Sequence, residues 1–393
     1  MLKIIADDKI PFLRGVLEPF AEVEYLPGKD LTKEKVKDID GIITRTRTKC
    51  KKELLEGSKV KIIASATIGY DHIDTLWCEE NNIVWKNAPG CNSSSVMQYM
   101  ASLLLHFAVR NNISLAGKTL GVIGVGNVGR KVAALGRIFG MNVLCNDPPR
   151  ARKEGKEGFA ELDEIIKKSD FISFHVPLIE EGKDRTFHYA DEKFFSALEK
   201  DGKRPFLINA SRGEVVDNVL LKKVLKEKKI LCGAALDVWE NEPELDLELL
   251  KLTDFATPHI AGYSLDGKAN GTSMSVQEIA KYFSLPLTDF YPESLPVPEN
   301  AFIELSGEGG GKAEEILLEC MDRSYNILED DKRLRESPET FEKQRGSYPF
   351  RREMVAYTVK NAPASVKESL IKLGFTVSDR ERKEKNGETL EKM

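Results

Sequence analysis

The chain has 393 residues, 41% of them hydrophobic and 31% charged, a composition typical of a folded protein rather than a disordered one. This length exceeds one comfortable hydrophobic core, so we expect two or three domains. The net charge of −5 gives no reason to expect nucleic-acid binding, and any anionic ligand would need a local cluster of basic residues.

The six cysteines are scattered and include no C-x-x-C pair, which favours reduced thiols over disulfides or a zinc site. The N-terminal segment becomes acidic at Asp7 and Asp8, too early for a signal peptide. No apolar run approaches the roughly 20 residues of a membrane span. We therefore expect a cytoplasmic protein without a metal site.

Residues 2–86 alternate short apolar segments with helical ones. The predicted strands are Leu2–Ala6, Val23–Tyr25, Gly41–Ile43, Lys61–Ala64 and Ile83–Trp85, and the predicted helices include Leu31–Lys37 and His72–Asn81. This alternation predicts a parallel sheet with helices on both faces, and therefore a small α/β domain.

Two polar loops follow the third and fourth of these strands, at the sheet edge where ligands of parallel sheets bind. The first loop carries Arg45, Arg47 and Lys49, and the second spans Ser65–Asp71. Cations beside hydroxyls and backbone N–H groups suit a phosphate or a carboxylate, so Arg45 and its neighbours are candidates for binding one. A solvated basic loop is the alternative, which the sequence leaves open.

Residues 94–110 are apolar almost all round. A helix of this kind is normally buried between two bodies, so we expect it to bridge the first domain to the second. His106 within it is interpreted as a packed core histidine rather than a ligand.

The stretch Gly124-Val-Gly-Asn-Val-Gly129 has the G-x-G-x-x-G spacing of a dinucleotide site, between a predicted strand and a predicted helix. Its glycines allow a tight turn, an approach to a pyrophosphate and close packing of helix on strand. Asp147 ends the following predicted strand, where it can accept hydrogen bonds from ribose hydroxyls and would repel a 2′-phosphate. NAD is therefore favoured over NADP, and a structural turn with a surface aspartate is the alternative.

Later strands are predicted at Phe171–Phe174, Phe206–Asn209 and Cys232–Leu236, and later helices at Glu161–Lys168, Asn218–Lys226 and Gly267–Phe283. The last of these helices is expected to lead the chain back to the first domain. We therefore predict a discontinuous first domain of residues 1–93 and 266–288, a nucleotide-binding domain of residues 94–265, and a C-terminal domain of residues 293–393.

The C-terminal domain follows a proline-rich linker and reads as a further α/β unit. Its predicted elements are the strand Ala301–Leu305, a long helix Lys312–Leu328, the strand Met354–Val359, the helix Pro363–Leu373 and the strand Phe375–Val377. The glycine-rich stretch at 306–313 is interpreted as a mobile turn, and the charged tail after Asp379 as frayed. Because this unit carries no catalytic-looking group of residues, we expect it to mediate assembly.

Arg212, Glu242 and His259 follow predicted strands and together suit the oxidation of a 2-hydroxy acid. Arg212 can bind the carboxylate through its planar fork, and an imidazole such as that of His259 can accept the hydroxyl proton. Glu242 can orient the imidazole through a hydrogen bond. Taken singly they would be a surface arginine, a capping glutamate and a buried histidine. Their joint placement on one crevice favours a catalytic set.

Five motifs occur in a single order along the chain: Thr67-Ile-Gly-Tyr-Asp71, Gly124 to Gly129, Asn209-Ala-Ser-Arg-Gly213, Ala235-Leu-Asp-Val-Trp-Glu-Asn-Glu-Pro243 and Thr257-Pro-His-Ile-Ala261. In these motifs the chain resembles the D-2-hydroxyacid dehydrogenase family. The resemblance implies a Rossmann-type, doubly wound parallel sheet domain that binds NAD, a smaller flavodoxin-like lid domain that binds substrate, and a C-terminal α/β dimerisation domain.

The resemblance also implies residue roles. It assigns catalysis to Arg212, Glu242 and His259. It implies substrate contacts at Thr46, Thr67 and Tyr263, and cofactor contacts at Gly124, Gly126, Asn127, Val128, Gly129, Asp147, Val176, Asp237 and Gly262. Val176 stands where a threonine is usual, and Gln98 stands where a glutamate is expected.

The implied reaction is the oxidation at C2 of a small phosphorylated 2-hydroxy acid by a homodimeric enzyme, with Arg45 and its neighbours holding the phosphate. Arg351 and Arg352 are a further hypothesis, as side chains that reach the active site of a partner subunit. One alternative is a related dehydrogenase that acts on 3-phosphoglycerate or another 2-hydroxy acid. An alternative of another class is a non-catalytic NAD(H)-sensing binding protein.

Overall fold

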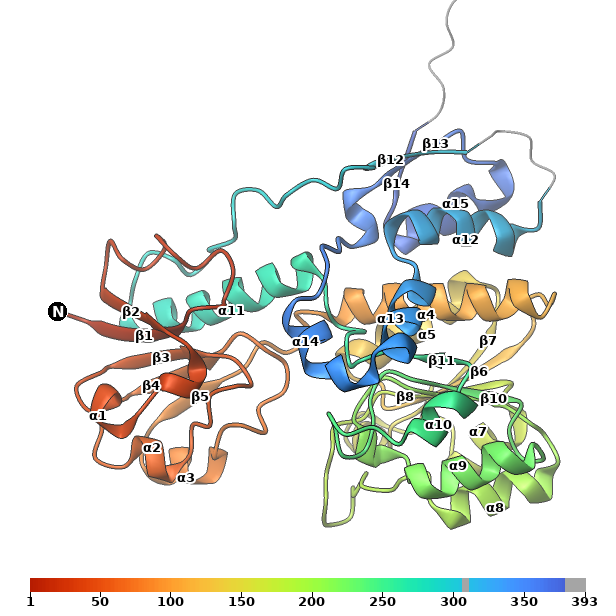
Figure 1. Cartoon of the computed structure of the whole chain (residues 1–393), viewed down its shortest axis with the longest axis horizontal. Coiled ribbons are helices and arrows are strands. Elements are labelled where there is room, and N and C mark those ends of the chain that lie inside the picture. The colour runs from red at the N-terminus through yellow and green to blue at the C-terminus, as the bar shows by residue number, and fades with distance from the viewer. Residues whose placement is uncertain (306–310, 379–393) are drawn as a thin grey trace, which may run out of the picture.

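The structure is a computed structural model that describes residues 1–305 and 311–378. Three parallel sheets divide it into three α/β units, which Figure 1 shows with the first unit on the left and the last at the upper right. Most of the predicted turn at 306–313 lies outside the described residues. The predicted tail after Asp379 lies entirely outside them.

The first sheet has the strand order β2-β1-β3-β4-β5, all parallel. Its strands are β1 (Lys3–Asp7), β2 (Glu22–Leu26), β3 (Gly41–Thr44), β4 (Ile62–Ser65) and β5 (Val84–Lys86), and its short helices are α1 (Lys33–Val36), α2 (Lys52–Leu55) and α3 (Thr75–Glu80). The order is that of flavodoxin-like sheets, as the resemblance implied. Each predicted strand is present within one or two residues of its predicted bounds.

A helix from much later in the chain covers this first sheet. α11 (Leu265–Phe283) packs on β4, and a Cβ added at Gly271 would lie 2.3 Å from the carbonyl oxygen of Ala66. Glycine at this position therefore allows the helix to approach the end of β4 closely. Figure 1 shows α11 running from the junction of the units across the first sheet.

The second sheet has the order β11-β10-β9-β8-β6-β7 and is also parallel. Its strands are β6 (Thr119–Ile123), β7 (Asn142–Asn146), β8 (Phe171–Phe174), β9 (Phe206–Asn209), β10 (Gly233–Leu236) and β11 (Phe255–Ala256). Its helices are α5 (Asn127–Ile138), α6 (Pro148–Glu154), α7 (Leu162–Lys168), α8 (Glu192–Asp201), α9 (Asn218–Glu227) and α10 (Leu247–Leu252). The order reverses beside β6, which makes the end of β6 the switch point where a ligand is expected.

α4 (Ser93–Arg110) is buried on almost every side, which explains its all-round apolar sequence. It packs against α5 on one side and against α12 of the third unit on the other, so the second and third units share one core. Nε2 of His106 lies 2.8 Å from a carboxylate oxygen of Asp322 on α12. His106 is thus a packed residue at this interface, as predicted.

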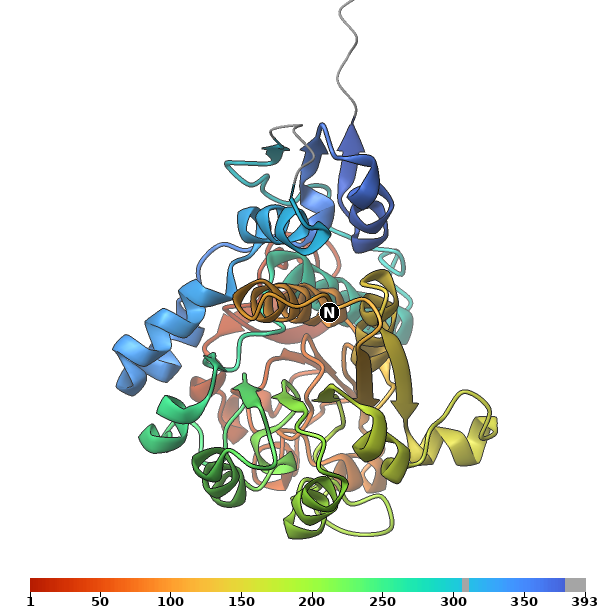
Figure 2. The ribbon, with the colours of Figure 1, turned by 90° about the vertical axis from the view of Figure 1, so that its right-hand side faces the viewer.

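The third unit has a three-stranded sheet of order β12-β13-β14, which lies above α4 in Figure 2. Its strands are β12 (Phe302–Glu304), β13 (Thr358–Lys360) and β14 (Thr376–Ser378), and its helices are α12 (Ala313–Ser324), α13 (Ile327–Glu336), α14 (Phe341–Gly346) and α15 (Ala364–Leu373). The single long helix predicted at 312–328 is wrong. The chain leaves the helix at Tyr325, and Asn326 begins α13 by accepting a hydrogen bond from the backbone N–H of Leu328.

α13 and α14 reach from the third unit down to the other two. A carboxylate oxygen of Asp331 on α13 accepts a 2.7 Å hydrogen bond from the backbone N–H of Ala256 on β11. Glu342 on α14 pairs with Arg47 in the loop after β3. α14 therefore lies where the three units meet, as Figure 1 shows.

None of the helices in the described ranges combines the length and the apolar character that crossing a membrane requires.

Candidate active site

The glycine motif forms the turn between β6 and α5. Gly124 has a φ of +85°, and a Cβ at Gly129 would lie 1.9 Å from the carbonyl oxygen of Gly124, so both positions require glycine. A Cβ at Gly126 would meet nothing within 4 Å. The turn is therefore tightly packed at Gly124 and Gly129 and open at Gly126. At this open position the backbone N–H groups at the start of α5 can bind a pyrophosphate.

Asp147 follows β7 and turns toward the glycine motif. One carboxylate oxygen accepts a 2.8 Å hydrogen bond from the backbone N–H of Val125, and the other accepts one from Arg150 at the start of α6. A hollow of about 200 Å³ adjoins it, lined by residues that include Pro148, Phe159 and Ala160. Its apolar side chains fit an adenine and Asp147 fits the ribose hydroxyls, while the two cations of the lining, Arg152 and Lys156, are paired with Asp184 and Glu161.

Arg212, Glu242 and His259 come from the loops after β9, β10 and β11, which are neighbours in the second sheet. The first two loops touch, because a Cβ at Gly213 would lie 2.0 Å from the carbonyl oxygen of Trp239. The backbone N–H of Trp239 in turn donates a 2.9 Å hydrogen bond to Glu242. The topology therefore brings all three loops to one edge of the sheet, as the sequence predicted.

Glu242 and His259 are in direct contact. Nδ1 of His259 lies 2.8 Å from the second carboxylate oxygen of Glu242. With Nδ1 donating to this oxygen, Nε2 is the atom that can exchange a proton with a substrate. Both side chains are only partly buried, so the imidazole remains accessible from the space between the first two units.

Asp237 lies beneath the His259 loop and is 2% exposed. Its two carboxylate oxygens accept hydrogen bonds from the backbone N–H groups of Ile260 and Ala261 and from the hydroxyl of Thr257. Burial raises the pKa of Asp237, and the surrounding donors oppose this shift. The visible role of Asp237 is to hold the loop that carries His259, and the cofactor contact that the resemblance implies for it stays a prediction.

The loop after β4 brings the first unit to Arg212. A Cβ at Gly69 would lie 2.9 Å from the guanidinium of Arg212, and a carboxylate oxygen of Asp71 lies 3.6 Å from it. Thr67 is fixed within the same loop by hydrogen bonds of its hydroxyl to Ser65 and to the carbonyl oxygen of Gly69. Arg212 therefore faces the predicted substrate loop across the gap between the units.

Arg45 is not a free cation. Its guanidinium donates two hydrogen bonds, of 3.0 and 2.8 Å, to one carboxylate oxygen of Asp7 at the end of β1. Asp7 was not predicted as a site residue, although an acid at the end of the first strand is the signal that could have indicated it. Thr46, beside Arg45, is exposed.

The remaining predicted contacts lie close to the glycine motif or the His259 loop. Val176 packs on the turn at Gly124, and Gly262 lies against Asn92 at the start of α4. Asn127 and Val128 form the first turn of α5. Tyr263 follows Gly262, and its backbone N–H donates a 2.8 Å hydrogen bond to the carbonyl oxygen of Ile260.

Comparisons with known proteins agree with this geometry. A family model described as the NAD binding domain of D-isomer specific 2-hydroxyacid dehydrogenase matches residues 106–261, and a domain of unknown function matches residues 295–374. An erythronate-4-phosphate dehydrogenase from Bacteroides thetaiotaomicron is 50% identical over 360 residues, which are 91% of this chain and 99% of that protein. The chain belongs to the erythronate-4-phosphate dehydrogenase family.

Other relatives of that name extend the match across bacteria. Those from Porphyromonas gingivalis and Escherichia coli are 41% and 38% identical, over 92% and 95% of this chain and 96% and 98% of their own lengths. A solved D-lactate dehydrogenase from Aquifex aeolicus, complexed with NAD and lactic acid, has a TM-score of 0.58 at 26% identity and covers 72% of this chain and 95% of that one. The predicted family, fold class and NAD cofactor are thereby confirmed.

The side chains of Arg351 and Arg352 are buried by contacts within their own chain. Arg351 stacks on the ring of Tyr325 and donates a 2.9 Å hydrogen bond to Gln98 on α4. Arg352 donates two hydrogen bonds to the two carboxylate oxygens of Asp266 on α11. Both arginines are less than a tenth exposed. The hypothesis that they reach a partner's active site is therefore wrong, because their contacts join the third unit to the helices of the first two. Gln98 supplies its amide oxygen to this junction where a glutamate was expected.

One group of possible metal ligands occurs in the described part of the chain. His188, Asp217 and Glu240 place ligand atoms within 4.8 Å of one another. These carboxylates already cap the start of α9, where Asp217 accepts from Leu220 and Glu240 accepts from Asn218. These hydrogen bonds explain the cluster as a cap of the α9 N-terminus, without a metal ion.

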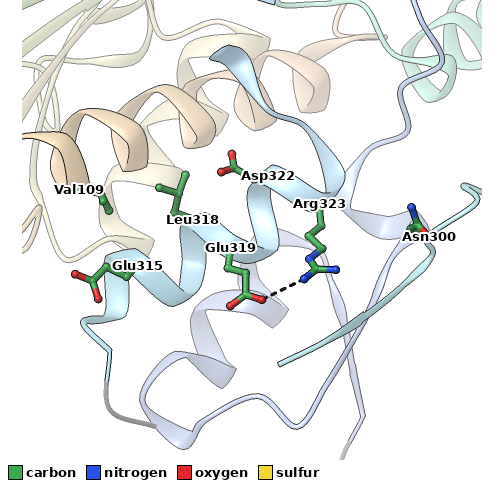
Figure 3. Close-up of a pocket in the computed structure, with 7 residues that line it drawn as sticks. All are labelled: Val109, Asn300, Glu315, Leu318, Glu319, Asp322 and Arg323. Carbon is green, nitrogen blue, oxygen red and sulfur yellow. Dashed lines mark hydrogen bonds and ion pairs between the residues drawn. The ribbon is translucent and has the colours of Figure 1, made fainter. Parts of the chain in front are cut away.

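A hollow of about 600 Å³ lies away from the glycine motif, on the outer face of α12 (Figure 3). Acidic side chains dominate its lining, and Arg323 pairs with Glu319 within it at 3.5 Å. It contains none of the predicted site residues, so the site is assigned from the strand ends and the glycine motif instead.

Proposed function

We propose that this chain oxidises 4-phospho-D-erythronate at C2 with NAD, giving (R)-3-hydroxy-2-oxo-4-phosphooxybutanoate, in the biosynthesis of pyridoxal 5′-phosphate. The observation that carries the proposal is the identity of 50% over nearly the whole length of a relative named erythronate-4-phosphate dehydrogenase. The meeting of Arg212, Glu242 and His259 beside a glycine turn that fits a pyrophosphate supports it.

NAD, when bound, supplies the hydride acceptor. Arg212 clamps the substrate carboxylate through its guanidinium fork. His259 takes the C2 hydroxyl proton on Nε2 as the C2–H bond breaks, while its Nδ1–H keeps the proton and donates a hydrogen bond to Glu242 that holds the ring in place. Glu242 is fixed in turn by the backbone N–H of Trp239. In the reverse direction His259 returns the proton to the oxygen.

A substrate panel tests this function against its alternatives. The values of kcat/KM with NAD are measured side by side for 4-phosphoerythronate, 3-phosphoglycerate and unphosphorylated 2-hydroxy acids. A clear preference for 4-phosphoerythronate supports the proposal, and a preference for 3-phosphoglycerate assigns the chain to a related dehydrogenase. Binding of NADH, seen as a fluorescence change, without turnover of any acid would identify a sensor.

We further propose that the chain acts as a homodimer through its third unit. The support is a set of strongly exposed apolar side chains there, namely Val297, Phe302, Phe350, Val355 and Ile371. Light scattering on the full chain tests this. A dimer that Val355→Glu or Phe302→Glu converts to a monomer supports the proposal, and a monomeric wild-type chain contradicts it.

The proposed location is the cytoplasm. All six cysteines are free, and five of them are buried in the units they belong to. Reduced, scattered thiols are typical of proteins from reducing compartments. Fractionation of cells that express the chain, with detection by antibody, checks the location.

A further inference from the structure

Two cations from different units flank Tyr263, four positions after His259. Nζ of Lys268, in the first turns of α11, lies 5.6 Å from the centre of the Tyr263 ring, and Cζ of Arg345, on α14, lies 6.0 Å from it. Neither residue was predicted as a site residue, because the two are far apart in the chain and lie in different helices. Figure 1 shows both helices meeting at the junction of the three units.

Lys268 forms no ion pair with any carboxylate of residues 1–305 and 311–378. Burial and the nearby guanidinium of Arg45 both lower its pKa. Lys268 is nevertheless exposed to solvent. A cation crowded by another cation and lacking a counter-charge is the arrangement in which an anionic ligand is most stabilising.

The side chain of Arg345 is largely buried, and only part of its hydrogen-bonding capacity is used. One terminal nitrogen donates a 2.9 Å hydrogen bond to Glu342, but Glu342 is shared with Arg47. Nε of Arg345 is buried without a hydrogen-bond partner among the residues that the structure describes. Burial acts to lower the pKa of Arg345, and the nearby Tyr263 and Glu242 outweigh this and raise it, so the guanidinium lies within electrostatic reach of the catalytic residues.

We propose that Lys268 and Arg345 bind the 4-phosphate of the substrate beside Tyr263, so that the third unit contributes a residue to the active site of its own chain. This inference rests on the proposed function for the identity of the substrate. The planar fork of Arg345 matches two phosphate oxygens, and the ammonium of Lys268 adds a second charge from the opposite helix.

The rival phosphate site is the basic loop after β3. Arg45 there already donates Nε and one terminal nitrogen to Asp7, whereas Arg345 donates one terminal nitrogen to Glu342 and keeps Nε available. The short turn from His259 to Tyr263 places the proposed site near the reacting carbon. A substrate held by its carboxylate at Arg212 can therefore extend its phosphate toward Tyr263.

The experiment compares Lys268→Met and Arg345→Gln with wild type, using 4-phosphoerythronate and unphosphorylated erythronate. The ratio of the two kcat/KM values is expected to fall about 10–100-fold in each variant, because each loses a charged hydrogen bond to the phosphate. KM for NAD should not change, and Arg345→Lys should recover part of the ratio.

Matched controls are Lys281→Met, on the same helix as Lys268 but paired with Glu278, and Arg323→Gln, in the third unit but paired with Glu319. Both should leave the ratio unchanged. Equal losses for the two substrates in the Lys268 and Arg345 variants would overturn the inference.

A calorimetric titration with inorganic phosphate separates this inference from the proposed function. If wild type fails to oxidise 4-phosphoerythronate, the proposed function fails, but the phosphate site is still tested. Weaker phosphate binding in both variants supports the site, and unchanged phosphate affinity in both overturns it.

Discussion

The imidazole of His259 and the carboxylate of Glu242 lie in direct contact, with 2.8 Å between Nδ1 and the carboxylate oxygen. The two residues come from loops after different strands, and Asp237 fixes the His259 loop from beneath. The contact leaves Nε2 as the nitrogen that can exchange a proton, so the proposed proton transfer depends on the geometry of both loops.

Replacing His259 by Asn is expected to lower kcat about 10²–10⁴-fold, because a general base is lost while the loop keeps its hydrogen bonds to Asp237. Stopped-flow turnover and NAD titration check this together. NAD affinity should remain close to that of wild type, and an unchanged kcat would remove His259 from the mechanism.

The glycine motif offers a matched pair of substitutions. Gly129→Ala is expected to destabilise the fold by about 1–3 kcal/mol or more, because its Cβ would lie 1.9 Å from the carbonyl oxygen of Gly124. Gly126→Ala meets no neighbour within 4 Å, so it should keep the wild-type Tm and weaken NAD binding instead. Thermal melts and NAD titrations separate the two. A normal Tm for Gly129→Ala would contradict the packing described for the turn.

Asp147→Ser should raise the kcat/KM for NADP relative to that for NAD by about tenfold, since a negative charge beside the ribose is removed. Serine can still cap α6, as Asp147 does through Arg150. Steady-state kinetics with both cofactors measure the change. An unaltered cofactor ratio would show that Asp147 serves only the turn and the helix cap.

Arg45→Ala is expected to lower the free energy of unfolding by about 1–3 kcal/mol, because Asp7 loses its charged hydrogen bonds inside the first unit. Its control is Arg47→Ala, which removes an exposed pair and should cost less than about 1 kcal/mol. Urea unfolding compares them. A selective loss of phosphorylated substrates in Arg45→Ala at unchanged stability would instead restore this loop as the phosphate site.

Acidification should destabilise the first unit through His72. Burial lowers the pKa of His72 to about 4, from about 6.5 in an unfolded chain. The unfolded state therefore binds more protons between these values, so the stability is present above pH 6.5 and is lost as the pH falls toward 4, by up to about 3 kcal/mol. Urea unfolding at pH 7 and pH 4.5 should show a smaller pH dependence in His72→Gln than in wild type.

Much of the fold could be predicted from the sequence because the strands are short apolar runs separated by polar loops. The strands β8 and β9 begin and end where they were predicted. The break at Tyr325 was missed because α12 and α13 are both helical in pattern, and the turn between them is set by contacts such as the hydrogen bond from the Tyr325 hydroxyl to Asp330.

The sequence by itself determined the nucleotide turn and the proposed catalytic triplet, since the spacing of glycines and the order of strands in a parallel sheet place those residues at one edge. Only the tertiary structure decided which charges near the site remain available. It pairs Arg45 with Asp7, buries Arg351 and Arg352, and brings Arg345 from the third unit toward Tyr263. The physical reason is that ion pairing depends on distances of a few ångströms between residues far apart in the chain, which local patterns of apolar and polar residues do not encode.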